Sequence, residues 1–426
     1  MRRVQLISLG CSKNRVDSEH LLRRLQLQGC RIVPEDADLA EAGVDTVYIN
    51  TCGFIQDAKE ESIETILQAV EAKKAGYIKH IKVFGCLAQR YRDELPAELP
   101  EVDEFMGVLD LDGDTERVLT TPKHYAYLKI SEGCDRSCSY CAIPLIRGPH
   151  RSVPMEKLVA EAENLAAMGV RELIVIAQDT TYYGIDLYGK RTLAKLLERL
   201  ARIDGIEWIR IHYSYPTSFP DDVLDLMASN PKVCSYIDIP LQHSADKVLS
   251  MMRRGIDGRA TRELVARMRS KVPGVVLRTT LIVGHPGEGE AEFEDLLDFV
   301  RECRFERLGA FMYSEEEGTY GALNYGDDIP QEVKQERYDR LMELQSAISE
   351  SYNTSRIGST ERVLIDSYTD GVLVARSQME SPEVDGEILI GDGRSLGMFV
   401  PHRLIGSFAN VKITGANEYD LLAELI

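Results

Sequence analysis

Three closely spaced cysteines are the residues of this chain with the clearest potential for chemistry. Cys134, Cys138 and Cys141 lie within eight residues of each other. Three thiolates at these spacings can hold three corners of a cubane iron–sulfur cluster and leave the fourth iron open. A zinc site is the alternative, with His124 or His150 near enough in sequence to be the fourth ligand.

A second set of cysteines is spread over the first hundred residues. Cys11, Cys52 and Cys86 each come directly after an apolar, β-branched run. Taken alone, any one of them could be a buried structural cysteine. Glycine flanks each of them, however, and allows close backbone approach. These glycines are Gly10, Gly53 and Gly85.

The elements around this second set predict that its members meet. The runs Val4 to Leu9, Thr46 to Asn50 and Ile81 to Phe84 are strand-like, and helical patterns over Ser18 to Gln28 and Ala58 to Lys74 separate them. This alternation predicts a parallel sheet, whose strands end at one edge. We therefore expect a second three-cysteine cluster, again with an open iron.

Six strand-like runs alternate with helical stretches between Lys123 and about Tyr352. Because a closed TIM barrel needs eight repeats, six predict an open (β/α)6 partial barrel with its reactive face at the strand carboxyl ends. The Cys134 loop follows the first of these strands. A helical stripe should pack back on the barrel; its members are Tyr338, Leu341, Leu344 and Ile348. The strand-like runs are Tyr125 to Ile130, Leu173 to Gln178, Trp208 to Tyr213, Tyr236 to Pro240, Val275 to Gly284 and Leu308 to Tyr313.

The last part of the chain changes to short alternating segments with turn signals. It predicts a small antiparallel β-barrel of OB-like size. The fold class is thus α/β plus a small all-β domain, divided at 1–118, 119–357 and 358–426. The expected strands are Thr360 to Asp366, Gly371 to Arg376, Gly386 to Ile390, Phe399 with Val400, and Gly406 to Ile413.

Charge and composition exclude several classes of protein. The 426 residues contain 50 Lys and Arg against 69 Asp and Glu, a net charge of −19. No overall positive field therefore attracts nucleic acid or an anionic membrane. No stretch approaches about 18 uninterrupted apolar residues, and the apolar part of the first ten residues is too short for a leader. We expect a cytoplasmic protein without a membrane partner.

That compartment bears on the nine cysteines. In a reducing cytoplasm, regular cysteine spacing indicates metal or catalysis before disulfides. The scattered Cys30, Cys234 and Cys303 are expected to be buried apolar side chains.

The Cx3CxΦC pattern, with Tyr140 as its aromatic residue, resembles the signature of the radical S-adenosylmethionine (SAM) superfamily. The resemblance implies a [4Fe-4S] cluster whose open iron chelates the amino and carboxylate groups of SAM. One electron then cleaves the cofactor to a 5′-deoxyadenosyl radical. Tyr140 is therefore a candidate cofactor-binding residue.

Other residues give weaker signals. Gln178 and Asp179 end the second barrel strand, where the superfamily contacts the cofactor's amino group; ordinary loop capping is the alternative. Gly284 ends the fifth strand and could bring backbone close to the cofactor, or be a turn residue only. Arg253 and Arg254 are interpreted as a solvated helix face. No catalytic residue is assigned beyond the clusters, and none of the isolated histidines, His212, His243 and His402, is given a role.

The three segments in this order resemble the methylthiotransferase family, which has an N-terminal three-cysteine domain, a radical SAM barrel and a C-terminal TRAM barrel. Local stretches resemble the branch that modifies ribosomal protein S12; the tRNA-modifying branch typically has Met-Asn in place of Lys13-Asn14. Val153 stands where an arginine is expected, which leaves Arg147 and Arg151 without an assigned role. The stretches that carry the branch are Ser8 to Glu19, Cys141 to Pro144, Gln178 to Gly184 and Tyr236 to His243.

Charge supports the same branch. A TRAM barrel that grips tRNA should be basic, because phosphate neutralisation dominates nucleic-acid affinity. Residues 358–426 hold 5 Lys and Arg against 11 Asp and Glu, which suits a basic ribosomal protein. Surface acids could instead only keep the domain soluble.

The resemblance implies methylthiolation of the β-carbon of an S12 aspartate. The Cys134/Cys138/Cys141 cluster would generate the hydrogen-abstracting radical, the Cys11/Cys52/Cys86 cluster would deliver sulfur, and a second SAM would supply the methyl group. An electron donor is then a required partner, and tRNA is not expected as one. Two alternatives stay open: the same chemistry on a tRNA adenosine, and a non-catalytic iron–sulfur or zinc scaffold that binds ribosomal proteins.

Overall fold

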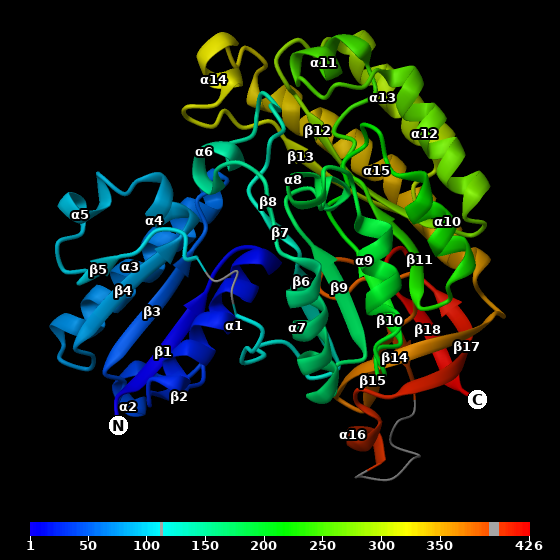
Figure 1. Cartoon of the computed structure of the whole chain (residues 1–426). Helices are drawn as coiled ribbons and strands as arrows, with labels where there is room; N and C mark the ends of the chain where they lie inside the picture. Colours follow the sequence, from blue (N-terminus) through cyan, green and yellow to red (C-terminus); the bar gives the residue numbers. More distant parts are fainter. Residues whose placement is uncertain (111–113, 392–399) are drawn as a thin grey trace.

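The structure is a computed structural model that describes residues 1–110, 114–391 and 400–426. Its N-terminal part is a parallel sheet in the order β2-β1-β3-β4-β5 (Figure 1). All six residues of β3 are buried, as expected for a central strand covered on both faces. The predicted parallel sheet is confirmed, and β2 and β5 add to its edges. The strands are β1 Arg3–Ser8, β2 Arg31–Val33, β3 Thr46–Thr51, β4 His80–Gly85 and β5 Glu104–Phe105.

Helices cover this sheet, and the first differs from its prediction. Helix α1 begins at Ser12, directly after Cys11, and not at Ser18. Its first turns carry polar side chains that are nevertheless buried, among them Asn14 and Asp17, so they lack the apolar periodicity of a core-facing helix. The helices are α1 Ser12–Leu27, α2 Leu39–Ala42, α3 Gln56–Lys74, α4 Cys86–Arg90 and α5 Leu95–Glu98.

Six parallel strands form the middle of the described chain, in the order β6-β9-β10-β11-β12-β13. No ladder among the described residues joins β6 to β13, so the predicted open partial barrel is confirmed. The strands are β6 Tyr125–Lys129, β9 Glu172–Ile176, β10 Trp208–Ile211, β11 Val233–Asp238, β12 Val276–Val283 and β13 Arg307–Met312. The larger helices are α7 Met155–Ala167, α9 Leu193–Leu200, α10 Asp221–Ser229, α11 Asp246–Met251, α12 Gly258–Lys271 and α13 Glu290–Cys303.

Short elements shape the reactive end of this barrel. A small antiparallel hairpin, β7 Ser131–Glu132 with β8 Arg151–Ser152, encloses the cysteine loop and helix α6 Ile143–Arg147. Figure 1 shows α6 next to α4 of the N-terminal part. A 3-10 helix over Thr180–Tyr182, α8 Ile185–Tyr188 and α14 Tyr320–Asn324 complete this end.

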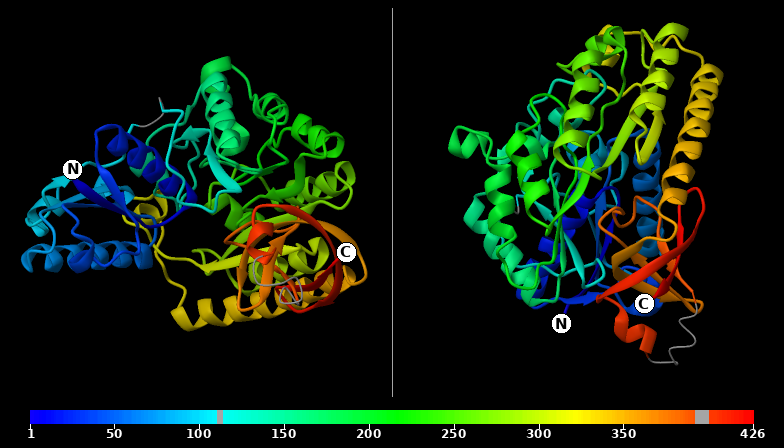
Figure 2. Two further views of the ribbon diagram at one scale, coloured as in Figure 1. Left: turned by 90° about the horizontal axis from the view of Figure 1, so that it is seen from below. Right: turned by 90° about the vertical axis from the view of Figure 1, so that its right-hand side faces the viewer.

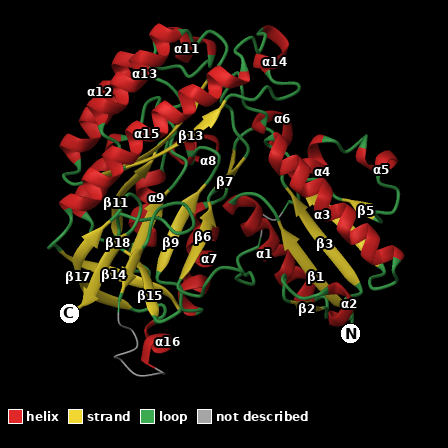
Figure 3. Ribbon diagram, turned by 180° about the vertical axis from the view of Figure 1, so that it is seen from behind, coloured by secondary structure: helices red, strands yellow, loops and turns green. Residues whose placement is uncertain are grey.

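The long helix α15, Gln331–Ser355, lies across β13 (Figure 3). Leu341 and Ile348 belong to the main core, and Tyr338 and Leu344 pack against it, which confirms the predicted stripe. The helix ends at Ser355, five residues before the first strand of the C-terminal barrel, so it connects the two barrels.

The C-terminal strands close into a barrel in the order β14-β15-β16-β18-β17. Two expectations were wrong: β16 pairs with β18 in parallel, and Val400 begins helix α16 Val400–Leu404 instead of a strand. Phe399 lies outside the described residues. The strands are β14 Thr360–Thr369, β15 Val372–Arg376, β16 Ile388–Ile390, β17 Phe408–Ala416 and β18 Leu421–Leu425, the last of which was not predicted.

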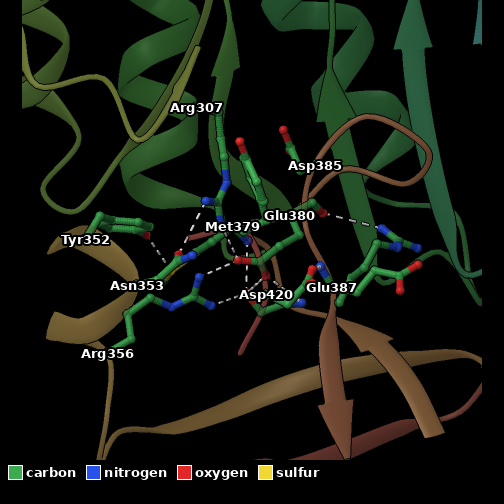
Figure 4. Close-up of polar contacts among 12 residues, drawn as sticks. Arg307, Tyr352, Asn353, Arg356, Met379, Glu380, Asp385, Glu387 and Asp420 are labelled. Atoms are coloured by element: carbon green, nitrogen blue, oxygen red, sulfur yellow. Dashed lines mark hydrogen bonds and ion pairs between the residues drawn. The ribbon is translucent and has the colours of Figure 1, made fainter. Parts of the chain in front are cut away.

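The partial barrel packs against both other parts of the chain (Figure 2). The loop after β15, which belongs to the C-terminal barrel, contacts the partial barrel and α15. Its Glu380 accepts from Arg307 at 3.1 Å and also from Arg356 (Figure 4). Glu383, further along, accepts from the Tyr127 hydroxyl of β6 at 2.8 Å and from Arg15 of α1 at 2.8 Å. One loop therefore links all three parts.

Candidate active site

The three N-terminal cysteines come together at one edge of the sheet. Cys11 follows β1, Cys52 follows β3, and Cys86 opens α4 after β4. Gly10 has a φ of +84°, and a Cβ there would lie 2.8 Å from the Cβ of Cys52. Only glycine permits this approach. The Cys11 loop and Cys52 are therefore direct neighbours at this edge of the sheet.

These thiols influence one another electrostatically. Burial raises the pKa of Cys86 to about 11, an effect that Arg147 opposes and Cys11 and Cys52 reinforce. Burial also raises the pKa of Cys52, with Cys11 adding to the shift. Positive metal ions stabilise thiolates and reverse such shifts. Three cysteines near enough to couple electrostatically fit the donor set of an iron–sulfur cluster.

The loop after β6 gathers the first set, Cys134, Cys138 and Cys141. Cys134 N donates to Gly148 O at 3.0 Å, and Cys141 N donates to Cys138 O at 3.2 Å, which folds the loop back on itself. Burial raises the pKa of Cys134 to about 11 and that of Cys141 to about 12, and Cys138 adds to both shifts. The donor set again fits a cluster held by three cysteines.

Arg254 is a site residue that sequence reasoning missed. The interpretation of a solvated helix face was wrong for it, because it is 4% exposed. Its Nη1 donates to Cys138 Sγ at 3.4 Å and to the Tyr140 hydroxyl at 3.2 Å. Its guanidinium also lies 4.3 Å from the ring centroid of Tyr215. Two adjacent arginines give no local sign of this burial.

The predicted cofactor residues of the second strand face the cysteine loop. Gln178 Nε2 donates to Glu132 Oε1 at 2.8 Å, and Asp179 accepts from Arg136 Nε at 2.9 Å. The Gln178 Oε1 acceptor is buried without a hydrogen-bond partner. A buried orphan acceptor fits the amino group of SAM, which is a donor.

Gly284 and its turn have a different set of contacts. Its φ is +74°, and a Cβ there would lie 2.4 Å from Lys334 Cγ, so α15 already accounts for a glycine at this place. The next residue, His285, does reach the cysteine loop: its Nε2 lies 3.4 Å from Ser139 Oγ. Its ring also meets the Tyr140 ring edge-on at 6.4 Å. Burial lowers the pKa of His285 to about 4, which keeps it neutral.

Arg147, left without a role from the sequence, joins the helix after the Cys141 loop to Cys86. It lies at the end of α6, just after Cys141, and its Nε donates to Cys86 Sγ at 3.3 Å. Its Nη1 lies 2.9 Å from both Asp17 of α1 and Glu132 of β7. Lys129 pairs with the same two carboxylates. We name Asp17, Lys129, Glu132 and Arg147 the junction network.

The junction network is buried and charge-balanced. Burial would raise the pKa of Glu132, but Lys129 and Arg147 outweigh it and lower that pKa to about 2. Glu132 is therefore a carboxylate near neutral pH. Next to the network, Cys86, Ala142 and Ile146 form one small apolar cluster. Arg151, by contrast, is exposed on β8.

The histidines considered for a zinc site have side-chain partners other than cysteine. His124 Nε2 contacts Asp366 of the C-terminal barrel at 2.7 Å, and His150 Nε2 contacts Ser152 Oγ at 3.0 Å. Within residues 1–110, 114–391 and 400–426, no group of three or more His, Cys, Asp or Glu is placed to hold a single metal ion. A cubane cluster holds its thiolates further apart than one ion does.

Histidines taken as isolated have partners. His243 Nε2 lies 3.0 Å from Glu288 Oε2, and His212 Nε2 lies 2.8 Å from Ser381 Oγ. His402 lies edge-on to Tyr368, with ring centroids 5.0 Å apart. The His243 contact lies within the partial barrel, the His212 contact joins the partial barrel to the loop after β15, and the His402 contact lies within the C-terminal barrel. None of them involves a cysteine.

Three known protein families match successive parts of the chain. Residues 3–107 match the uncharacterized protein family UPF0004, residues 128–300 the radical SAM superfamily and residues 357–426 the TRAM domain. The superfamily match implies one [4Fe-4S] cluster and SAM as cofactors. In the parts of the chain that the structure describes, no helix is long and apolar enough to cross a membrane.

Solved structures share the fold at low identity. The radical SAM methyltransferase TsrM from Kitasatospora setae has a TM-score of 0.53 and 13% identity, covering 95% of this chain and 84% of that one. The cobalamin-dependent SAM radical enzyme OxsB has a TM-score of 0.51 and 14% identity, covering 82% and 56%. These likenesses concern the fold alone.

Curated relatives match the whole chain. The ribosomal protein uS12 methylthiotransferase RimO of Porphyromonas gingivalis is 51% identical over 439 residues, covering 100% of this chain and 99% of the relative. The protein of the same name from Cytophaga hutchinsonii is 48% identical, covering 100% and 98%. The chain therefore belongs to the ribosomal protein uS12 methylthiotransferase family of radical SAM enzymes.

Proposed function

We propose that this chain methylthiolates an aspartate of ribosomal protein uS12 at its β-carbon, with SAM and two [4Fe-4S] clusters as cofactors. The observation that carries the proposal is the junction of the two cysteine sets, where Arg147 follows Cys141 and contacts Cys86. Full-length relatives named for this activity support the choice of reaction. The segments 1–118, 119–357 and 358–426 are proposed as the three domains that perform it.

The two cysteine sets divide the reaction between them in this proposal. The target C–H bond is unactivated, and a bound radical SAM cluster supplies the radical chemistry that can break it. Cys134, Cys138 and Cys141 are proposed to hold that cluster, with Gln178 accepting from the amino group of SAM. Asp179 orients Arg136, and Tyr140 with Arg254 supports the loop. Cys11, Cys52 and Cys86 are proposed to hold the second, sulfur-delivering cluster.

The substrate is proposed to be a protein and not a tRNA. The C-terminal barrel carries a net charge of −6 over residues 358–426. An acidic surface repels phosphates, and it favours encounter with a strongly basic ribosomal protein. The reaction also needs an external electron donor as a partner.

Anaerobic reconstitution tests the proposal as a whole. The protein is analysed for iron and sulfide, then incubated with SAM, reductant and either uS12 or tRNA. We expect about eight irons per chain and a gain of about 46 Da, the methylthio group less one hydrogen, on one aspartate of uS12. A mass gain on tRNA alone would refute uS12 as the substrate. Failure of the reconstituted protein to cleave SAM would indicate the non-catalytic scaffold instead.

Single cysteine variants separate the two clusters. Cys134→Ala and Cys52→Ala should each reduce the iron content from about eight to about four per chain, and each should abolish methylthiolation. Cys303→Ala is the matched control, because Cys303 is buried on α13 among apolar core residues. Either variant that still methylthiolates at the full rate would contradict the division of labour.

A further inference from the structure

Lys13 lies between the second cysteine set and the partial barrel. It sits in the first turn of α1, two residues after Cys11, and α1 lies between the N-terminal sheet and β6 (Figure 1). Its Nζ is 3.2 Å from the ring centroid of Tyr213, which follows β10 of the barrel. The Ser12 hydroxyl lies 3.5 Å from the Tyr213 hydroxyl. Lys13 therefore points from the Cys11 loop toward the barrel.

This buried ammonium has no carboxylate partner. Lys13 is only 9% exposed, and no described carboxylate forms an ion pair with it. The acids nearest to this region are already paired: Asp17 with the cations of the junction network, and Asp238 with Arg278 at 2.8 Å. Tyr213, Cys11 and Asp238 favour the ammonium electrostatically against the effect of burial, and an anionic ligand would add the ion pair that Lys13 lacks.

The aromatic platform under Lys13 is held in an unusual conformation. Tyr213 has a φ of +58°, a left-handed value that is rare for a bulky residue. Two hydrogen bonds hold it there: Tyr213 N donates to Asp238 Oδ2 at 2.9 Å, and Thr180 N donates to Tyr213 O at 3.1 Å. Thr180 follows the candidate cofactor residues Gln178 and Asp179. Such conformations persist where the surroundings enforce them, commonly at active sites.

We propose that Lys13 binds the side-chain carboxylate of the target aspartate and thereby selects it as substrate. The inference rests on the proposed function, which makes the reacting carbon the β-carbon of an aspartate. That carbon is bonded directly to the carboxylate carbon, about 1.5 Å away, so an ion pair at Lys13 holds the reacting carbon near the ammonium. The position lies between Cys11 and the 178–180 loop of the barrel, which come from the two proposed cluster sites. A neutral amide or a nucleobase would leave the ammonium unpaired.

A double-mutant cycle that combines enzyme variants with substrate variants tests this assignment. The substrates are wild-type uS12 and uS12 with asparagine at the aspartate that gains mass in the wild-type reaction. The enzymes, all reconstituted anaerobically, are wild type, Lys13→Met, Lys13→Arg and Lys79→Met. Lys79 is a matched control because its side chain is 72% exposed and pairs with Asp45 at the far end of the sheet. Affinity is measured by fluorescence anisotropy, with iron content and reductive SAM cleavage recorded for each enzyme.

Lys13→Met should weaken binding of wild-type uS12 about tenfold but that of the asparagine substrate less than twofold. Lys13→Arg should retain most of the affinity, and Lys79→Met should behave as wild type. Equal losses on both substrates, or no loss on either, would overturn the assignment while leaving the mass gain on uS12 intact. If wild-type enzyme adds no mass to any uS12 aspartate, the proposed function fails, and the inference fails with it.

Discussion

Replacing Arg147 by methionine should loosen the contact between the N-terminal sheet and the partial barrel. Methionine keeps an unbranched side chain but removes the charge. Asp17 and Glu132, 4% and 2% exposed, are then left with Lys129 as their ion-pair partner among the described residues. Removing one member of a buried ion-pair group costs about 3 to 5 kcal/mol, because it leaves a buried charge uncompensated.

The pKa of Glu132 shows how the Arg147 charge contributes to the stability of the fold. Its folded pKa of about 2 lies below the ordinary 4.5, so the carboxylate stabilises the fold above pH 4.5 and loses this contribution as the pH falls toward 2. Arg147→Met raises the folded pKa, and each unit regained corresponds to about 1.4 kcal/mol at pH 7. A loss of about 3 kcal/mol increases the opening equilibrium constant about 100-fold.

Hydrogen exchange at pH 7 measures that opening locally. Amides at the start of α1 and around β7 should exchange up to about 100-fold faster in Arg147→Met than in the wild type. Arg199→Met is the matched control, because Arg199 pairs with Glu156 at 2.9 Å on the surface, where ion pairs contribute little. Adding Glu132→Gln to Arg147→Met should restore part of the protection. Unchanged exchange in Arg147→Met would refute the reasoning.

Three other predictions concern separate parts of the molecule. Gly10→Ala should reduce the iron content from about eight to about four per chain, because its Cβ would collide with Cys52. Gly29→Ala is the control: Gly29 has a similar positive φ but no atom within 4 Å of the added Cβ, so this variant should keep the full iron content. Arg254→Met removes a hydrogen bond and a positive charge from the barrel cluster and should shift its reduction potential to a more negative value in a spectroscopic titration. Two buried arginines lower the pKa of Glu380 to about 2 against the effect of burial, so its carboxylate stabilises the C-terminal barrel contact above pH 4.5. Protonation of Glu380 should lower the melting temperature as the pH falls from 4.5 to 2, and Glu380→Gln should make the melting temperature depend less on pH over this range.

The positions of the cysteines could be predicted because they depend on local pattern and a general rule. Runs such as Val47 to Asn50 are short, apolar and β-branched, and a cysteine follows them at once. Parallel strands end at one edge, so the strand ends need no further information to be placed together. The six barrel strands were recognisable for the same reason.

The features of the fold and the site that could not be predicted depend on burial by residues far away in the sequence. Asn14 and Asp17 look like a solvated turn, yet they form the start of a helix that is buried against β6, β7 and α6. Arg254 likewise has no local sign of its contact with Cys138, 116 residues away. Strand β18 pairs in parallel with β16, and such a register depends on closure of the whole barrel. Each of these polar or marginal segments is specified by tertiary contacts.

The position of Arg147 supports the proposal that the two cysteine sets act as one site. Its guanidinium contacts Cys86 of one set, while its helix directly follows Cys141 of the other. A structural ion pair could join the two parts anywhere along α1, but this one is placed where the two loops meet and is satisfied on both sides by carboxylates. A reaction in which one loop activates a carbon and the other supplies its new sulfur needs that spacing held rigidly, because a misplacement of about 1 Å can reduce the rate 100-fold.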